Sequence, residues 1–266
     1  MNKSKIEWTD YTWNPVTGCL HGCNYCYARR IAERFGREYK SFKNNKGLNI
    51  LDKPFESYTK CMDISIDPYP YGFEPTFYKY RLDEPQKIKK PSKIFVSSMG
   101  DLFGDWVPDE WIGQILQVIE KCSQHKFLFL TKNPKRYLDI DEQGFANPDR
   151  VWLGTTVTSN KDIDRALELL KLPKHYNTFL SIEPLLGPVD LDKYELLCKT
   201  WRKGATIGKY LDWVIIGQQT GPGAVPPKDE WVQSIIDQCR AVGVPVFVKP
   251  PLYEQFPIQE WSEGLK

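Results

Sequence analysis

Three cysteines lie within eight residues near the start of the chain, at Cys19, Cys23 and Cys26. Spacings of four and three residues let one short loop wrap three thiolates around a metal centre, and Gly18 and Gly22 suit the tight turns of such a loop. Iron–sulfur clusters are held by cysteine thiolates, and four ligands complete a four-iron cluster. Because no fourth cysteine lies nearby, the spacing predicts one iron open to a small molecule, which by analogy with catalytic metal sites indicates chemistry.

Two other interpretations of these cysteines stay open. One is a zinc site that His21 or a remote cysteine completes, and the other is three unrelated buried thiols, which this spacing disfavours. The chain has 7 cysteines, an odd number that suits thiolate ligation in a reducing compartment better than a disulfide framework. Cys122 and Cys239 fall in predicted amphipathic helices and are expected to be small buried hydrophobes, whereas Cys61 and Cys198 have no local partner at ligand spacing.

Composition narrows the class of protein. The 266 residues carry 36 basic and 34 acidic side chains, a net charge of +2, which excludes a strong global attraction to nucleic acid but allows a local basic face. Aromatic residues make up 14%, so some are expected to line a groove or pocket. No apolar run is long enough to span a bilayer, and residues 1–10 are polar, so we expect a cytosolic protein.

Short apolar runs alternate with amphipathic stretches, which predicts an α/β fold with parallel strands. The runs expected to be buried strands are Ile94–Ser98, Phe127–Thr131, Val151–Thr155, Thr178–Ile182, Trp213–Gly217 and Val244–Val248. Two further strands at Tyr11–Asn14 and Thr76–Arg81 bring the number to about eight, enough for a full or nearly full barrel. The helices are expected at Trp111–Cys122, Asp162–Leu170 and Lys228–Val242.

We therefore expect one barrel domain over residues 1–266, with an insertion at about residues 37–71. The insertion either covers the mouth of the barrel or is a solvated loop. Polar residues follow five of the predicted strands, as at Ser98, Thr131 and Glu183. Because the carboxyl ends of parallel barrel strands form the active face, this pattern predicts a site there.

At these residues the chain resembles the radical SAM superfamily, whose motif Cys19, Cys23 and Cys26 match, with Tyr25 before the last cysteine. The segments Trp13–Cys19, Ser98–Phe103 and Ser181–Leu185 look like its uncharacterised phage-associated branch. The resemblance covers nearly the whole chain and implies a radical SAM (β/α) barrel, partial or nearly complete. It also implies a [4Fe-4S] cluster, S-adenosylmethionine (SAM) as cofactor, and a reductant such as flavodoxin or ferredoxin. This branch has no settled activity, so no catalytic residue is assigned.

A more distant resemblance to spore photoproduct lyase implies roles for individual residues. Lys132 would pair with the SAM carboxylate, and Asp101 or Ser98 would contact its ammonium or ribose. The other residues that this resemblance places at SAM are Thr155, Thr156 and Thr158 at ribose or carboxylate, Tyr25, Tyr27 and Gly217 near adenine, and Glu183. The lyase carries its hydrogen-donating cysteine close to where Ser98 falls, and this departure counts against the same dimer-splitting cycle.

Structural explanations exist for several of these side chains. Lys132 before Asn133-Pro134 also suits an exposed turn, and Asp101 suits a helix N-cap. Glu183 could be a carboxylate at the rim of the core paired with an arginine, and Lys249 a salt-bridge partner only.

The expected substrate class is a nucleic acid or nucleotide. A basic run close to the cysteines carries aromatic residues, including Phe35, Tyr39 and Phe42, that could stack on bases. A solvated helix face explains the same run and is slightly favoured. Two rival functions remain: a nucleic-acid-binding module with a structural zinc or cluster and no catalysis, and a redox carrier that does not cleave SAM.

Overall fold

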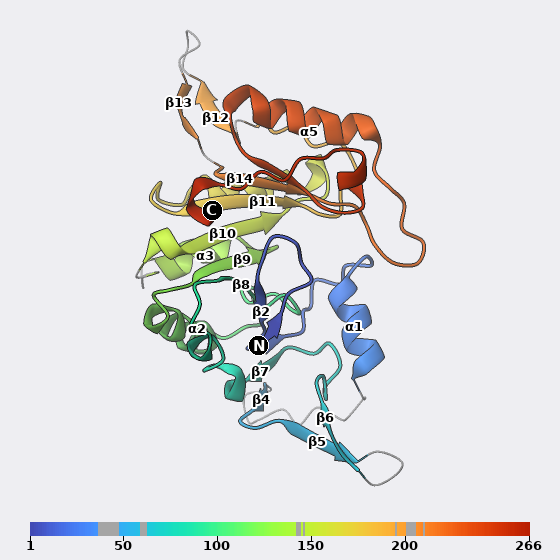
Figure 1. Ribbon diagram of the computed structural model, residues 1–266, viewed down its shortest axis with the longest axis vertical. Helices are drawn as coiled ribbons and strands as arrows, with labels where there is room; N and C mark the ends of the chain where they lie inside the picture. Colours follow the sequence, from blue (N-terminus) through green and yellow to red (C-terminus); the bar gives the residue numbers. More distant parts are fainter. Residues whose placement is uncertain are drawn as a thin grey trace. The chain divides into compact units, whose positions relative to one another are not determined.

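The computed structural model describes residues 1–36, 48–58, 63–141, 145, 147–194, 196–200, 206–209 and 211–266. It has a mixed α/β fold with a large, mostly parallel sheet, and it divides into two compact units, Met1–Phe127 and Leu128–Lys266 (Figure 1). The single barrel domain expected over the whole chain stays a prediction. Among the described residues, no helix is both long enough and apolar enough to cross a membrane.

The first unit contains three small groups of strands and two helices. Its part of the large sheet has the order β1-β2-β8, formed by β1 (Asn2–Lys3), β2 (Tyr11–Trp13) and β8 (Lys93–Val96). A three-stranded sheet has the order β3-β7-β4, formed by β3 (Val16–Thr17), β7 (Thr76–Tyr78) and β4 (Asn49–Leu51). Strands β5 (Phe55–Tyr58) and β6 (Ile64–Asp67) pair as an antiparallel ribbon, and the helices are α1 (Tyr27–Phe35) and α2 (Asp109–Lys121).

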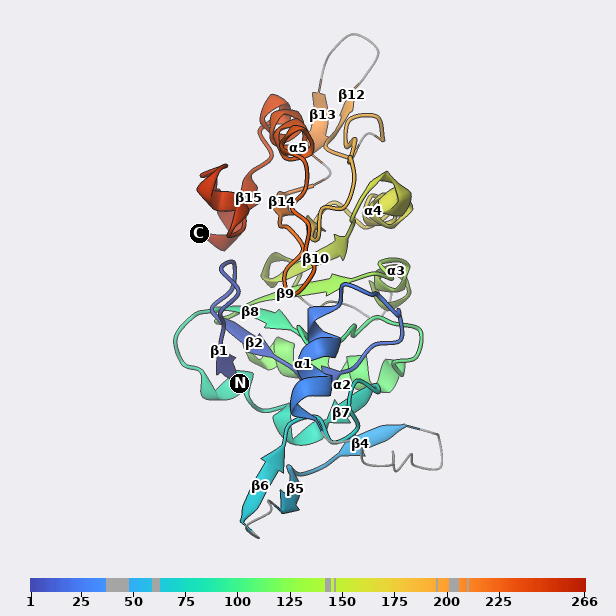
Figure 2. The ribbon, with the colours of Figure 1, turned by 90° about the vertical axis from the view of Figure 1, so that its right-hand side faces the viewer.

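The second unit carries most of the parallel strands. Their order is β9-β10-β11-β14-β15, formed by β9 (Lys126–Thr131, which begins in the first unit), β10 (Val151–Thr156), β11 (Asn177–Ile182), β14 (Trp213–Ile216) and β15 (Val246–Val248). The helices are α3 (Lys135–Asp141), α4 (Ile163–Leu169) and α5 (Asp229–Val242). Strands β12 (Cys198–Thr200) and β13 (Thr206–Lys209) form an antiparallel pair that lies beside α5 (Figure 2).

Most of the predicted strands are confirmed, because burial on both faces leaves a clear signal in the sequence. All six residues of β10 are buried, as parallel strands covered on both sides require. One expectation is wrong: Thr76–Arg81 does not add a strand to the large sheet. Residues Thr76–Tyr78 pair with β3 and β4, so their backbone groups are satisfied there, and a 3₁₀ turn follows at Lys79–Arg81.

The strand order is open in each unit, so neither unit by itself closes a barrel. Of the expected insertion, residues 37–47 and 59–62 lie outside the described part, while β4, β5 and β6 belong to it. Helix α1 lies at the start of the basic run for which a helix face was the favoured interpretation, whereas helix α3, with 7 residues, was not predicted.

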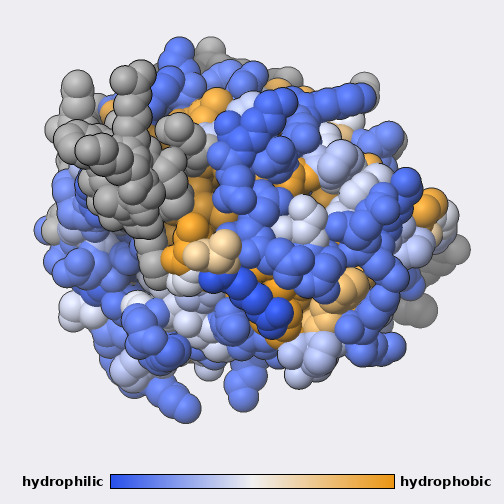
Figure 3. Space-filling view, turned by 90° about the horizontal axis from the view of Figure 1, so that it is seen from above, coloured by the Kyte–Doolittle hydropathy of each residue, from blue (hydrophilic) through white to orange (hydrophobic). Residues whose placement is uncertain are grey.

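Exposed apolar side chains are scattered in the second unit. Those that stay exposed there are Leu186, Val225 and Tyr253. The face drawn in Figure 3 is mostly hydrophilic, with smaller hydrophobic areas between hydrophilic residues. Single exposed apolar residues are ordinary on protein surfaces and indicate no interface by themselves.

The packing of β10 against β11 yields a test of the sheet. A Cβ added at Gly154 would lie 2.4 Å from two carbons of the Phe179 ring, which is fully buried. Gly154→Ala should therefore lower the free energy of unfolding by about 1–3 kcal/mol through overpacking. Urea unfolding followed by circular dichroism measures the change.

The matched control for this substitution is Gly113→Ala in α2, where an added Cβ meets no atom within 4 Å. The helix gains backbone order there, so this variant should be more stable by about 0.5–1 kcal/mol. A Gly154→Ala protein as stable as the wild type would contradict the packing described for β10 and β11.

Candidate functional site

The three cysteines lie on a loop that connects β3 to α1. Gly18 anchors the start of the loop: its φ is +85°, its N–H donates to the Met99 carbonyl at 2.9 Å, and an added Cβ would lie 2.3 Å from the Glu74 carbonyl oxygen. At the other end Cys26 is the N-cap of α1, and its thiol accepts from the Arg29 N–H at 3.4 Å. Glycine at 18 is therefore required by both conformation and space.

All three thiols are free and half-buried. Cys19 and Cys26 pack against a small cluster of buried residues that includes Ala28, Phe73 and Met99. The pKa of the Cys19 thiol is raised to about 12: burial is the main cause, Asp101 and the other two cysteines act in the same direction, and a backbone hydrogen bond at His21 acts in the opposite direction. Without a cation beside it, Cys19 is therefore held as a neutral thiol.

The donor chemistry of this loop fits an iron–sulfur cluster. Cysteine thiolates are the ligands that hold iron–sulfur clusters, and iron cations beside the loop would stabilise the thiols in this charged form. Among the described residues, no three His, Cys, Asp or Glu side chains stand close enough to share a single metal ion. In a four-iron cluster each thiolate binds a different iron, so its ligands stand further apart than those of one ion.

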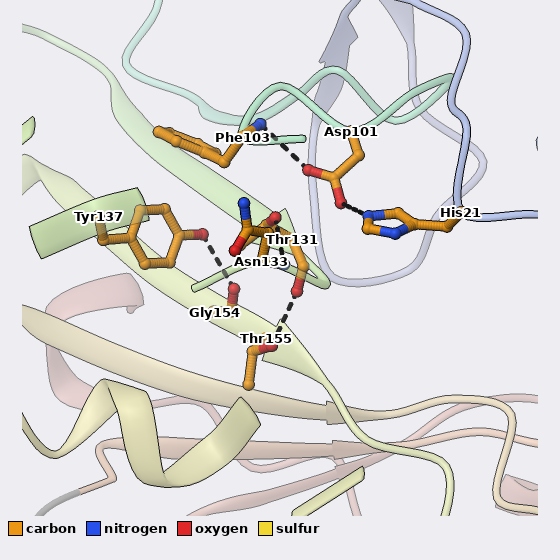
Figure 4. Close-up of polar contacts among 8 residues, drawn as sticks. All are labelled: His21, Asp101, Phe103, Thr131, Asn133, Tyr137, Gly154 and Thr155. Carbon is orange, nitrogen blue, oxygen red and sulfur yellow. Dashed lines mark hydrogen bonds and ion pairs between the residues drawn. The ribbon is translucent and has the colours of Figure 1, made fainter. Parts of the chain in front are cut away.

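A histidine–aspartate pair adjoins the cysteine loop (Figure 4). His21 Nε2 donates to Asp101 Oδ2 at 2.8 Å, and Asp101 Oδ1 accepts from the Phe103 N–H at 3.1 Å. Asp101 is buried, and the edge of His21 faces the Trp106 ring. His21, which the sequence offered as a nitrogen ligand, thus has its Nε2 engaged by a carboxylate. That pairing also brings Asp101 next to the loop, which sequence spacing did not indicate.

A second polar contact ties α1 to the end of β8. The Tyr27 hydroxyl donates to the Ser98 carbonyl at 2.6 Å, and Ser98 Oγ donates to Asn14 Oδ1 at 3.1 Å. The Met99 N–H donates to the same Asn14 oxygen at 3.0 Å. Sequence reasoning missed the role of Asn14, although an amide directly after a strand was an available signal. Ser97, beside Ser98, has φ +57°, a strained conformation of the kind that clusters at functional sites.

In the second unit, Lys132 lies in the turn that follows β9. The Thr131 hydroxyl accepts from the Asn133 N–H at 2.9 Å, and the Thr155 hydroxyl donates to the Thr131 carbonyl at 2.8 Å (Figure 4). Tyr137 donates to the Gly154 carbonyl at 2.9 Å. The turn is thus fixed on both sides of Lys132, which is half-buried, so the exposed-turn interpretation of this lysine does not describe it.

The other threonines predicted near SAM differ in what they contact. Thr156 is buried at the end of β10, opposite Ser181 of β11 in the strand register. Thr158 is bound locally, because both its N–H and its hydroxyl donate to Asp162 Oδ2, at 3.0 and 2.5 Å. Asp162 lies four residues further on, where the next helical turns begin, so these two hydrogen bonds fix the local backbone. Thr158 thus has a local structural role, whereas Thr156 does not show one.

Glu183 is paired with a lysine rather than an arginine. Lys249 Nζ donates to Glu183 Oε1 at 2.5 Å, with 15% of the lysine and 27% of the glutamate side chain exposed. A Cβ added at Gly217 would lie 3.0 Å from the Glu183 carboxyl carbon, so glycine lets the end of β14 approach this pair closely. Glu183, Gly217 and Lys249 therefore form one group at the carboxyl ends of β11, β14 and β15.

The predicted residues thus fall into two sets. The first set lies in the first unit, at the cysteine loop. The loop carries the three cysteines and the half-buried Tyr25, and next to it lie Tyr27, Ser98 and Asp101. In the second unit, Lys132 lies in the turn after β9, which Thr155 of β10 contacts through the Thr131 carbonyl; Thr156 ends the same strand β10, and Glu183 and Gly217 lie close together. The contribution of Asn14 was found only in the structure, whereas Lys249 is a salt-bridge partner, as one interpretation of the sequence had it, with Glu183 as its partner.

Comparison with known proteins gives one family and one fold. A family model described as "Protein of unknown function (DUF5131)" matches residues 3–251. No curated protein matches the chain. A solved structure of spore photoproduct lyase complexed with dinucleoside spore photoproduct is similar at a TM-score of 0.54 and 12% identity, covering 93% of this chain and 78% of that one.

A mutant of the same lyase with bound AdoMet and dinucleoside spore photoproduct is similar at a TM-score of 0.51 and 12% identity, covering 91% of this chain and 64% of that one. This chain therefore spans about two thirds to three quarters of the length of those proteins. At such low identity the likeness shows a shared fold and transfers no residue roles.

The raised pKa of Cys19 predicts slow alkylation of the metal-free protein. Its pKa moves from 9.0 to about 12, so at pH 8 the reactive thiolate should be on the order of 1,000-fold scarcer than in the unfolded chain. The iodoacetamide rate should rise about tenfold for each pH unit until the pH approaches that pKa. Tandem mass spectrometry of each cysteine peptide measures the rates.

The urea-unfolded protein provides the control for this measurement. Cys239, buried in α5 with a pKa also raised to about 12, provides an internal reference for a slow thiol. Equal rates for Cys19 in folded and unfolded protein would contradict the described environment.

Proposed function

We propose that this chain, which belongs to the family described as "Protein of unknown function (DUF5131)", is a radical SAM enzyme. The observation that carries the proposal is the loop of three free, half-buried thiols, Cys19, Cys23 and Cys26, on a fold similar to that of a lyase solved with bound AdoMet. The same likeness supports a partial (β/α) barrel as the arrangement of its strands and helices. We also propose that the protein works in a reducing cytoplasm and belongs to the phage-associated branch of the radical SAM superfamily.

A [4Fe-4S] cluster and SAM, when bound, supply one-electron reductive cleavage of SAM to a 5′-deoxyadenosyl radical. Cys19, Cys23 and Cys26 would hold the cluster through three irons. The polar groups of SAM need partners once they leave water, and the described strand ends offer them. Lys132 offers a cation for the carboxylate, and Ser98 and Asp101 offer oxygens for the ammonium or ribose.

The other proposed contacts with SAM use side chains whose oxygens can still accept a hydrogen bond. Thr155 donates its hydroxyl proton to the Thr131 carbonyl, so its oxygen still accepts, and Thr156 is buried at the end of the same strand β10. Tyr25, Tyr27 and Gly217 are proposed to lie near adenine. Glu183, held by Lys249, presents a positioned carboxylate. Thr158 is the weakest member of the set, because Asp162 already binds its hydroxyl.

A nucleic acid or nucleotide is the proposed substrate class. Its support is the fold similarity to a lyase solved with a dinucleoside photoproduct. The sequence resemblance implies that Ser98 stands near the hydrogen-donating cysteine of the lyase. This departure argues for a different reaction on that substrate class, because a hydroxyl holds its hydrogen more tightly than a thiol does. Anaerobic reconstitution followed by an assay for 5′-deoxyadenosine with candidate nucleotides and oligonucleotides tests both parts.

Metal analysis of the cysteine variants tests the cluster. The reconstituted wild type should contain iron and sulfide in about equal amounts, and SAM should perturb its EPR signal. The triple variant Cys19→Ala, Cys23→Ala, Cys26→Ala should lose the iron, since no thiolate remains on the loop. Full iron content in this variant would overturn the assignment, and zinc alone in the wild type would indicate a structural metal site without catalysis.

Single substitutions of the other four cysteines are the controls for iron content. Cys122 and Cys239 are buried, as the helical pattern predicted. Cys61 lies outside the described residues, and Cys198 begins β12. Replacing any of the four with Ala should leave the iron content unchanged. Loss of iron in one of them would identify a fourth ligand or a second site.

Lys132→Ala tests the proposed contact with the SAM carboxylate. A charge-assisted hydrogen bond contributes about 1.5–3 kcal/mol, so the variant should bind SAM ~10- to 150-fold more weakly. Lys132→Arg should recover part of the affinity, since the charge stays while its geometry changes. Calorimetric titration of SAM into reconstituted protein without reductant measures the affinity.

Lys135→Ala is the matched control, because Lys135 is exposed in the next helix. Its effect should stay below about 0.5 kcal/mol. Unchanged SAM affinity in Lys132→Ala, with the iron content intact, would remove Lys132 from the site.

A further inference from the structure

The peptide unit between Ser98 and Met99 is held at both ends. The Tyr27 hydroxyl donates to its carbonyl oxygen at 2.6 Å, and its N–H donates to Asn14 Oδ1 at 3.0 Å. In a trans peptide the carbonyl and the N–H point in opposite directions, so partners on both sides fix the peptide plane. Asn14 directly follows β2, and Tyr27 directly follows Cys26, so this peptide unit connects the sheet to the end of the cysteine loop.

The turn that contains this peptide unit needs such support. Ser97 has φ +57°, and its buried hydroxyl has no hydrogen-bond partner among the described residues. A left-handed conformation and an unpaired buried hydroxyl each cost free energy, so they persist only where neighbouring contacts enforce them. The Ser97 N–H donates to the Trp13 carbonyl at 2.7 Å, and Asn14, the next residue of the chain, binds the far side of the turn. The end of β2 therefore fixes the turn after β8.

The direction of the hydrogen bond between Asn14 and Ser98 follows from the same contacts. A backbone N–H can only donate, so the amide atom of Asn14 that faces the Met99 N–H must be the oxygen, Oδ1. Ser98 Oγ lies 3.1 Å from that same oxygen. Because an amide oxygen carries no hydrogen, the Ser98 hydroxyl must donate its own. Ser98 Oγ then has only lone pairs left, and it presents an acceptor to a ligand.

We propose that Asn14 is a positioning residue that makes Ser98 an acceptor for the amino group of SAM. This inference rests on the proposed function, in which Ser98 contacts the ammonium or the ribose of SAM. A ribose hydroxyl both donates and accepts, so it can bind a serine hydroxyl of either direction. A protonated amino group only donates, so it gains from a serine whose direction is fixed. Asn14 acts through Ser98 and touches no reacting atom.

Removal of the amide oxygen tests this role. Asn14→Leu keeps a similar volume but leaves the Ser98 hydroxyl free to turn, so the reconstituted variant should bind SAM about 3- to 10-fold more weakly. Asn14→Asp retains an acceptor at the same place and should recover the affinity. Both variants should keep the iron content of the wild type, because the bond from the Gly18 N–H to the Met99 carbonyl remains. Calorimetric titration without reductant measures the affinity.

A SAM analogue with hydrogen in place of the amino group identifies the group that Ser98 accepts from. Its affinity should differ by less than about twofold between the wild type and Asn14→Leu, since the donor is missing. The double variant Asn14→Leu, Ser98→Ala should bind SAM no more weakly than Ser98→Ala alone, because both substitutions remove the same interaction. A merely structural role for Asn14 predicts instead that the two effects add and that SAM and the analogue are weakened alike.

The matched control is Asn177→Leu, which removes a half-buried amide at the amino end of β11, where its Nδ2 donates to the Pro148 carbonyl at 3.2 Å. This variant should bind SAM as the wild type does. A further readout needs neither cluster nor SAM. In the metal-free protein, the Met99 amide hydrogen should exchange about tenfold faster in Asn14→Leu than in the wild type, as measured by mass spectrometry. If the leucine variant does not fold, Asn14→Ala removes the same acceptor with less bulk.

The possible failures can be told apart. Faster Met99 exchange together with wild-type SAM affinity in Asn14→Leu would overturn the inference and leave the proposed function intact. Loss of iron in that variant, or equal weakening of SAM and the analogue, would also overturn it, because Asn14 would then support the fold alone. A wild type that carries the cluster but binds no SAM would overturn the proposed function, and the inference with it.

Discussion

The rest of the site depends on bringing three thiolates together in a partly buried loop. Burial and mutual repulsion hold Cys19 as a neutral thiol in the protein alone, with a pKa of about 12. The two ends of the loop are fixed by the surrounding structure: Gly18 is held against Met99 and Glu74, and Cys26 caps the start of α1. A cation cluster would relieve the electrostatic cost, so metal binding and the local fold are coupled.

Hydrogen bonds also hold many of the polar side chains at the strand ends. Asp101 accepts hydrogen bonds from His21 and Phe103, and Thr158 donates to Asp162, so these side chains help to shape their turns. Lys132 and Thr156 lie at strand ends where the backbone is held by neighbouring hydrogen bonds. A binding site made of polar groups on a rigid sheet needs both kinds of residue: those that fix the turns and those that contact the ligand.

Helix α1 connects these local arrangements to the surface. Its buried side is small, with Ala28 and Ala32 against Phe73 and Met99, which lets the helix lie close to the cysteine loop. Its arginines are then carried to the surface beside the cysteines rather than at a distance. Two of these arginines lie over the rings of Phe73 and Phe35, so charge and aromatic stacking are combined on one helix, where Tyr27 and Phe35 stay exposed.

The parallel strands could be predicted from the sequence, because Val151–Thr156 and the similar runs are buried on both faces and therefore mostly apolar. The three-cysteine loop could be predicted too, because ligand spacing is local. Three contacts depend on tertiary packing: Thr76–Tyr78 pairs with β3 and β4, Asp101 engages His21, and Lys249 binds Glu183. Each of these joins residues about 60 to 80 positions apart, except the parallel pairing of β7 with β4. No local propensity encodes such contacts, because distant segments meet, and their buried polar groups find partners, only when the chain packs.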